Sequence, residues 1–484
     1  MKKTTRRDFI KDASMLGLAS LAAPMFLGGC EEVMDSIRER PVRRCIQDND
    51  LVNAQLEIYK AAVSAMKALP NSDPRNWTRQ AEIHQNFCPH GNWFFFPWHR
   101  VYLYYFEQIC QQLTGETSFG LPFWSWCIEP RLPAQFWGAG NPLNNSTRVC
   151  TPTSVASPSD VGLGLVDGYL NQPNFGVFAG GNANSLRPGG SRQYGQIEGT
   201  PHNYIHGTFV RGDMATFMSP LDPIFWSHHC MVDVCWYEWN VLRNHQNTND
   251  TTWTNFNYSG MFVDGSGNPA QMTTAVSVLL PLLNYRYASD FSCQPIADNQ
   301  AIVDNDEAAF ESVKSVVSKG APIKLNVKER LTLADTAMTF STEGKTVAAK
   351  LSPISRAISS DSERVLMKLN GVQEPDDASA FLRVFINKAD ASPKTSTSDP
   401  HYAGSFYFFR HSRNAAPETV NFQVDITETL QRLKSLGELS GDDDVAVSLV
   451  AVSTDQESNA QIELPVKAIE VNVVEVATEM LNMN

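Results

Sequence analysis

Residues 84–100, HQNFCPHGNWFFFPWHR, place three histidines and one cysteine among six aromatic residues. A stretch with so many aromatic rings is expected to be buried. A buried imidazole costs free energy unless it has a partner. The stretch therefore raises the question of what His84, His90 and His99 bind.

The ten histidines of the chain are unevenly distributed, and seven of them fall in two clusters. The members are His84, His90 and His99 in the first cluster and His202, His206, His228 and His229 in the second. Imidazoles with few thiolates or carboxylates nearby suit copper, zinc, iron or nickel rather than magnesium or calcium. His202 and His206 are four residues apart and can bind one ion from one helical face. Facing helices of a bundle can bring such ligands to a buried pair of metal ions.

The alternative for any single histidine is a core or capping role, which is the commoner one. The presence of seven clustered histidines, including an HxxxH pair, favours metal binding over that alternative for the clusters as a whole. His245, His401 and His411 lie outside both clusters, and we interpret them as structural or surface residues.

Length and composition indicate a globular protein with at least two domains. The chain has 484 residues, is 42% hydrophobic and 19% charged, and carries a formal charge of -13. Chains longer than roughly 250–300 residues usually divide into domains. A nucleic-acid-binding protein would carry a basic patch, so the acidic balance argues against nucleic acid as a partner.

The first 30 residues are typical of an export signal. Arg6 and Arg7 precede an apolar run of small residues, as in signals of the twin-arginine route. The run ends in LGGC, which resembles a lipoprotein cleavage box with Cys30 as the acylated residue. Glu31 follows, so we expect a periplasmic protein that is anchored to the outer membrane. Ordinary peptidase cleavage near SLAAP is the alternative.

Residues 31–293 show helical periodicity with long loops between the helices, and we expect a mainly helical domain built on a four-helix bundle core. Asp73 and Pro74 predict the start of one helix, and residues 98–113 have apolar positions at helical spacing. Thr200 with Pro201, and Asp222 with Pro223, predict two further helix starts.

Three of the cysteines, Cys110, Cys230 and Cys235, fall in helical patterns and are expected to be buried thiols. Disulfide pairing is left open.

After an acidic linker at 294–325 the pattern changes from helical to alternating. TVNFQVDIT, DVAVSLVAV and IEVNVVEV alternate apolar and polar residues, and RVLMKLNGV and FLRVFINKA are further strand candidates. We therefore predict a β-sandwich domain over 326–484, with one short helix near 428–436 that ends at Gly437.

The motifs HGNWFFFPWHRVYLYYFE, LPFWSW, EGTPHNYIHG and SPLDPIFWSHHCMVDVCWYEW resemble the two copper-binding signatures of the tyrosinase and polyphenol oxidase family. The resemblance covers residues from about 50 to 245 and is specific, because the motifs are long and ordered. FLRVFINKA, HYAGSFYFFRH and GDDDVAVSLVAV are similar, more loosely, to the C-terminal domain of plant-type polyphenol oxidases.

The resemblance implies two copper ions as cofactors and assigns six ligands. His84, His90 and His99 would hold copper A, and the copper B ligands would be His202, His206 and His229. His228 lies about 100° from His229 on a helix and is left outside the ligand set. Asp233, one turn after His229, would orient a ligand or form a structural pair. The aromatic residues would form a dry wall around the metals and admit a flat phenol.

The resemblance also implies the reaction, which is the oxidation of phenols to o-quinones by molecular oxygen. Catechols would be oxidised, and monophenols would be hydroxylated as well. Glu198 would hold a water, with Asn203 polarising it, as a base for an incoming monophenol. The alternative for Glu198 is an acidic residue at a helix start. Cys88 would form a thioether bond with His90, or else a disulfide or a free thiol.

The C-terminal domain would shield the copper site and keep the enzyme latent until it is displaced. Phe406, Phe408 and Phe409 are the aromatic candidates for a plug, and the alternative is that each is a core residue of the sandwich.

Three other functions are alternatives to phenol oxidation. They are an o-aminophenol oxidase on the same site, a haemocyanin-like oxygen carrier, and a binding protein with structural zinc, which usually has cysteine ligands. The oligomeric state is left open.

Overall fold

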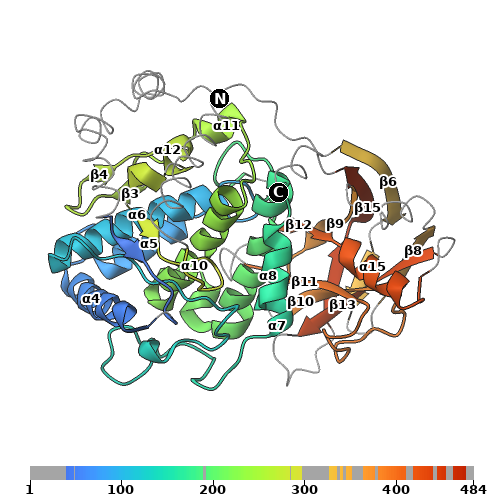
Figure 1. The fold of residues 1–484 in the computed structure, drawn as a ribbon, viewed down its shortest axis with the longest axis horizontal. Coiled ribbons are helices and arrows are strands. Elements are labelled where there is room, and N and C mark those ends of the chain that lie inside the picture. Colours follow the sequence, from blue (N-terminus) through green and yellow to red (C-terminus); the bar gives the residue numbers. More distant parts are fainter. Residues whose placement is uncertain are drawn as a thin grey trace.

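The computed structural model describes residues 40–47, 49–188, 192–278, 280–283, 285–296, 326–334, 338–341, 345–350, 363–375, 380–409, 418–439, 444–453 and 462–475. The signal over 1–30, including Cys30, most of the linker over 294–325 and His411 lie outside these residues. A helical part and a β-rich part lie next to each other (Figure 1). Within the described ranges, no helix has the length and apolar character needed to cross a membrane.

Four α-helices carry most of the helical part: α4 (Asn49–Ala68), α5 (Trp77–Phe87), α6 (Phe95–Thr114) and α10 (Ile224–Tyr237). Shorter helices are α7 (Pro158–Val161), α8 (Leu163–Leu170), α9 (Phe175–Ala179), α11 (Thr251–Thr254) and α12 (Thr274–Val278). Single turns are η1 (Ala134–Phe136), η2 (Glu198–His202), η3 (Ile205–Val210), η4 (Gly212–Ala215), η5 (Ser219–Leu221), η6 (Glu238–Leu242) and η7 (Leu280–Leu283). Short strands are β1 (Val42–Arg43), β3 (Phe262–Val263), β4 (Pro269–Ala270) and β5 (Arg286–Tyr287).

Helix α10 is the central element of the helical part, because all of its residues are buried. A helix that is buried on every side needs neighbours all around it, and α6 is one of them. The predicted start of α10 is confirmed to within a residue: the Asp222 carboxylate accepts a hydrogen bond from the backbone N–H of Ile224.

Two predicted helix starts are wrong. Helix α5 begins at Trp77 rather than at Asp73 and Pro74, because Asn76 caps it by accepting from the N–H of Thr78. Asp73 binds the Arg75 guanidinium instead. Thr200 caps no helix, since the backbone is already helical from residue 196 and Thr200 lies inside η2.

The segment around His202 and His206 also differs from the regular α-helix that the sequence predicts. It forms the π-helical turns η2 and η3. Pro201 lies inside η2 and has no N–H to donate, which interrupts the usual hydrogen-bond ladder. Such wide turns are frequent at functional sites.

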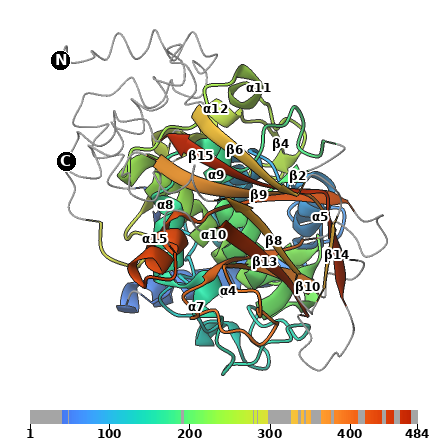
Figure 2. The ribbon, with the colours of Figure 1, turned by 90° about the vertical axis from the view of Figure 1, so that its right-hand side faces the viewer.

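Within the described residues, the β-rich part contains two large sheets and one two-stranded sheet. Its strands are β6 (Asn326–Ala334), β7 (Met338–Ser341), β8 (Lys345–Lys350), β9 (Glu363–Gln373), β10 (Ala380–Ile386), β11 (Tyr402–Tyr407), β12 (Thr419–Asp425), β13 (Asp444–Ser453), β14 (Glu463–Val466) and β15 (Ala468–Glu475). One sheet has the order β11-β10-β13-β8 and the other β2-β12-β9-β15-β6, where β2 is Arg192–Gln193; β14 pairs with β7. Figure 2 shows β9, β15 and β6 together above β13 and β8.

The five predicted strand segments in this part all form strands, and helix α15 (Thr427–Ser435) matches the predicted short helix. Gly437 follows with a φ of 75°, a conformation that glycine adopts readily after a helix. Residues from both sheets, including Met367, Leu382 and Val447, share one buried cluster. The alternating pattern therefore reports a buried face on each sheet.

The helical part is closed by a disulfide bond between Cys45 and Cys293. The bond joins residues near the two ends of the helical part, beside the parallel pair β1 and β5. Cys110, Cys230 and Cys235 are buried free thiols, as predicted. Since both partners of the disulfide precede the 294–325 segment, it does not tie the β-rich part to the helical part.

Candidate metal centre

Five helical elements and one loop bring the seven clustered histidines together. His84 lies on α5, His99 on α6, and His228 and His229 on α10, while η2 and η3 supply His202 and His206. His90 lies in the loop between α5 and α6. All seven are buried.

The structure groups these histidines as the sequence predicts. The possible ligand atoms of each group lie within 4.8 Å of one another, and the groups are His84, Cys88, His90 and His99, and His202, His206, His228 and His229. The two groups are neighbours, since the rings of His99 and His229 stack with centroids 4.1 Å apart. This arrangement can hold two ions close together.

Hydrogen bonds set the tautomer of four of these rings. In each, Nδ1 lies against a carbonyl oxygen: His84 with Phe217 (2.7 Å), His99 with Phe95 (2.7 Å), His206 with Met214 (2.7 Å) and His202 with the side chain of Asn203 (2.9 Å). A carbonyl oxygen only accepts, so Nδ1 carries the proton and donates it. The Nε2 lone pair is then available to a metal ion.

Two observations test whether a metal fits. Within the described part of the chain, no protein group hydrogen-bonds Nε2 of His84 or of His202, although both atoms are buried. Nε2 of His206 and Nε2 of His229 lie 3.1 Å apart. Two nitrogens that each bind one ion at about 2.0 Å are separated by roughly 3 Å. The residues therefore fit a bound metal at each group.

Burial also keeps the rings neutral. It lowers the pKa of His99 to about 3 and that of His206 to about 4, and it moves the pKa of His229 in the same direction. Only the neutral imidazole binds a metal ion. The site is therefore ready to bind metal at neutral pH without first losing protons.

His228 is distinguished from His229 by its partner. The indole N–H of Trp126 donates to Nδ1 of His228 (3.1 Å). Since an indole N–H only donates, Nδ1 of His228 accepts, and its Nε2 carries the proton. Neither nitrogen then offers a free lone pair, which supports the choice of His229 as the ligand.

The Cys88 thiol lies among the first group of histidines. Its Sγ is 3.9 Å from Nδ1 and 3.7 Å from Nε2 of His90, and 3.3 Å from Nε2 of His99. The ring carbon Cε1 of His90 lies between these two His90 nitrogens, so the sulfur is close to it as well. Burial raises the pKa of the thiol, so Cys88 is protonated at neutral pH.

Glu198 and Asn203 flank His202. Oε1 of Glu198 accepts from the backbone N–H of Gly91 (2.8 Å), and Oε2 is buried with no hydrogen-bond partner among the described residues. Burial raises the pKa of Glu198 well above its usual value. Asn203 donates its amide N–H to the carbonyl oxygen of Tyr407, in the β-rich part (2.8 Å).

Asp233 forms the structural pair that was one of its two predicted roles. Its carboxylate binds Arg100 (2.6 Å) and Arg43 (3.0 Å) and accepts from two tyrosine hydroxyls. Burial alone would raise the pKa of Asp233, but the two arginines lower it. None of these bonds reaches a histidine.

The three aromatic candidates of the β-rich part have different positions. Phe406 and Phe408 contact Phe422 in the buried cluster of the sheets, so they are core residues. The ring of Phe409 instead lies 4.6 Å from His90 and 5.0 Å from His206, measured between centroids. Sequence alternation could not separate these neighbours, because all three are buried.

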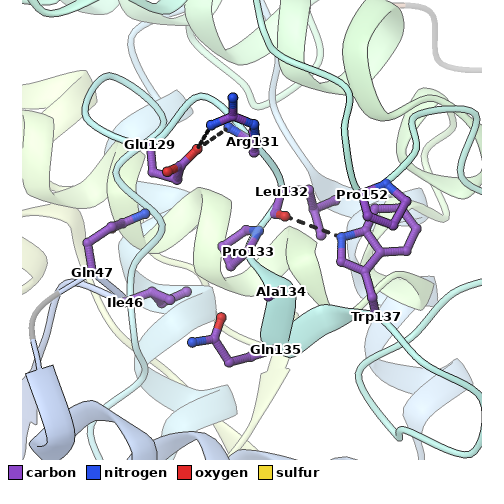
Figure 3. A pocket seen from close by; sticks show the side chains of 10 residues that line it. All are labelled: Ile46, Gln47, Glu129, Arg131, Leu132, Pro133, Ala134, Gln135, Trp137 and Pro152. Carbon is purple, nitrogen blue, oxygen red and sulfur yellow. Dashed lines mark hydrogen bonds and ion pairs between the residues drawn. The ribbon is translucent and has the colours of Figure 1, made fainter.

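Sequence analysis missed the groups that fix the histidines. The carbonyl oxygen of Phe217 and the indole of Trp126 come from loops, and the carbonyl oxygen of Met214 comes from the short turn η4, so only the fold places them beside the histidines. A surface pocket of about 360 Å³ was also missed. It is lined by Glu129, Trp137 and other residues, none of them histidine, and an ion pair joins Glu129 to Arg131 (Figure 3).

Comparisons with known proteins agree with this geometry. The family described as the common central domain of tyrosinase matches residues 65–178 and 166–242, and the chloroplastic polyphenol oxidase C-terminal domain matches residues 341–466. Chloroplastic polyphenol oxidase A1 of Vicia faba is 28% identical over 452 residues, covering 82% of this chain and 72% of that protein.

Two further similarities extend over most of the chain. A tyrosinase of Hahella sp. is 24% identical, with 86% of this chain and 96% of that protein covered. The solved structure of latent apple tyrosinase covers 90% of this chain and 97% of its own at 21% identity, with a TM-score of 0.66. That structure shares the fold of both parts.

Proposed function

The chain belongs to the tyrosinase and polyphenol oxidase family, and from that premise we propose that it oxidises both catechols and monophenols and is latent as folded here. It is an enzyme that acts on phenols at a pair of copper ions. The observation that carries the proposal is the pair of adjacent, buried groups of neutral imidazoles.

The protein residues hold and enclose the metals. We assign His84, His90 and His99 to copper A and His202, His206 and His229 to copper B. The backbone carbonyl oxygens bonded to Nδ1 orient the rings, and Phe95, Phe217 and Phe225 pack against them and exclude water. When bound, the copper pair supplies the activation of oxygen and the electron transfer that converts a phenol to an o-quinone.

Glu198 and Asn203 act on the proton of a monophenol. The unpartnered Oε2 of Glu198 is free to hold a water, and the Asn203 amide can polarise it once Tyr407 is withdrawn. A carboxylate with a raised pKa is a stronger base when ionised. Catechol oxidation depends less on this pair, because a catechol loses its protons more readily once it binds copper.

We expect Asn203→Gly to reduce monophenol turnover by roughly tenfold or more while catechol turnover falls much less. Activated enzyme would be assayed with matched monophenol and catechol pairs. Asn203→Asp is the control, because it keeps an oxygen acceptor for Nδ1 of His202 and replaces the amide donor with a carboxyl group. Equal losses on both substrates would count against the proposed base.

An o-aminophenol oxidase on the same site is the second candidate, and a haemocyanin-like oxygen carrier is the third. Copper-loaded enzyme assayed against monophenols, catechols and o-aminophenols distinguishes the three. Turnover of catechols at rates above those of o-aminophenols supports the proposal, and oxygen binding without turnover of any of them would overturn it.

We also propose a thioether bond between Sγ of Cys88 and the ring of His90. Its formation removes one hydrogen from the thiol and one from the ring, with oxygen as the oxidant at the copper site. The bond would fix His90, which lies on a loop. Copper-matured protein is expected to resist alkylation at Cys88 after denaturation and reduction, and its peptide should lack two hydrogens. Full alkylation of Cys88 would exclude the bond.

Latency rests on contacts from the β-rich part. The Phe409 ring occupies the space beside His90 and His206 where a flat phenol would enter, and the Tyr407 carbonyl holds the Asn203 amide. A tethered group blocks a site even when it binds weakly, because its effective concentration is high. We propose that the folded chain is a zymogen, and that 326–484 is a β-sandwich shielding domain joined by 294–325 to a catalytic domain over 31–293.

Export by the twin-arginine route and acylation at Cys30 complete the proposal, and they rest on the sequence alone. Membrane fractionation of cells is expected to find the wild-type protein with the outer membrane and Cys30→Ala in the soluble periplasmic fraction. A wild-type protein that is entirely soluble would show that the LGGC box has no role.

A further inference from the structure

Strand β2 belongs to the helical part of the chain but is an edge strand of the five-stranded sheet. It pairs in parallel with β12, with Arg192 opposite Val420 and Gln193 opposite Asn421. The pairing continues one residue further, where the N–H of Tyr194 donates to the carbonyl oxygen of Asn421 (3.2 Å). The two parts of the chain therefore share a sheet rather than only a surface.

The opposite edge of β2 is bound to the wall of the metal centre. The N–H of Gln193 donates to the carbonyl oxygen of Gly91 (2.8 Å), and the carbonyl oxygen of Gln193 accepts from Gly181 (3.0 Å). Gly91 follows His90 and donates its own N–H to Glu198. Strand β2 thus connects the sheet directly to the loop that carries a proposed copper ligand.

The Arg192 side chain adds two charge pairs across the same boundary, one of them buried. Its guanidinium binds Glu374 and, at 3.0 Å, Glu418, both of which belong to the β-rich part. Arg192 and Glu374 are buried, while the Glu418 side chain is nearly half exposed. Removing one partner of a buried pair leaves an uncompensated charge, which is strongly destabilising.

We propose that β2 and Arg192 form a latch that keeps the two parts together after the connecting segment is cut. The binding surface is the edge of β2 that faces β12, together with the buried Arg192 cation, and its partner is the β12 edge of this same chain with two carboxylates. Strand addition of this kind is a common mode of recognition. Cleavage alone then leaves Phe409 in place, and release requires the latch to break. The inference deepens the proposed latency but is measured independently of it.

The test uses the full chain with a specific protease site introduced between residues 300 and 320. After complete cleavage, wild-type halves are expected to co-elute in size-exclusion chromatography at micromolar concentration and to appear as one complex in native mass spectrometry. Arg192→Glu is expected to weaken the association by at least ~100-fold, because it opposes both carboxylates. Arg131→Glu, on the surface pair with Glu129, makes the same change in net charge and should have no effect.

A charge swap makes the test independent of misfolding. Arg192→Glu combined with Glu374→Arg should restore co-elution, whereas a folding defect at either position would persist. Separation of the cleaved wild-type halves, or co-elution of the Arg192→Glu halves as tight as wild type, would overturn the latch. If instead the latch holds but intact protein is already fully active, the proposed latency fails while the latch stands.

Discussion

The His206→Ala variant is expected to hold one copper ion per chain instead of two and to lose catechol oxidation by roughly a thousandfold or more. Nδ1 of His206 is held by the Met214 carbonyl and its Nε2 lies 3.1 Å from Nε2 of His229. The substitution removes one of the three proposed ligands of copper B, and a single copper cannot supply the paired chemistry. Copper per chain would be measured by elemental analysis alongside catechol turnover.

His228→Ala is the matched control, because His228 is buried in the same group and differs only in its tautomer. Because its lone pair is already used by Trp126, this variant should keep both copper ions. Two ions retained in His206→Ala, or one ion lost in His228→Ala, would contradict the ligand assignment.

Phe409→Gly in the uncleaved chain is expected to raise catechol oxidation by about fivefold or more. The substitution removes the ring that lies between His90, His206 and Phe217, and it leaves strand β2 and its ion pairs intact. Substrate no longer competes with a group tethered at high effective concentration. Initial rates would be compared with those of wild type in the presence and absence of mild detergent, which we expect to displace the β-rich part.

Phe409→Leu is the control for this prediction, since it keeps an apolar plug of smaller size and should give a smaller increase. Full-length wild type as active as its detergent-treated form would show that the β-rich part has no inhibitory role. Thermal unfolding of each variant would establish that the overall structure survives the change.

The sequence alone was sufficient for the features that depend on local patterns. Apolar residues at helical spacing predicted α6, and strict alternation predicted β12, β13 and β15, because each period reports which face of an element is buried. The start signal of Asp222 and Pro223 predicted α10. The histidine clusters could also be recognised in the sequence, since a metal site needs several ligands and imidazoles are frequent ligands of copper, zinc, iron and nickel. The start of α5 was predicted incorrectly because Asp73 and Asn76 are both good caps, and tertiary packing chose between them.

Only the tertiary structure decided the contacts between residues far apart in the chain. The sequence pattern does not distinguish Phe406, Phe408 and Phe409 from one another, yet of these three only Phe409 lies beside the histidines. The tautomer of His228 depends on Trp126, and the Cys45–Cys293 bond joins residues 248 positions apart. The pairing of β2 with β12 had no sequence signal, because a two-residue strand has no period. Periodicity records only whether a side chain is buried, whereas the partner that buries it depends on how the whole chain packs.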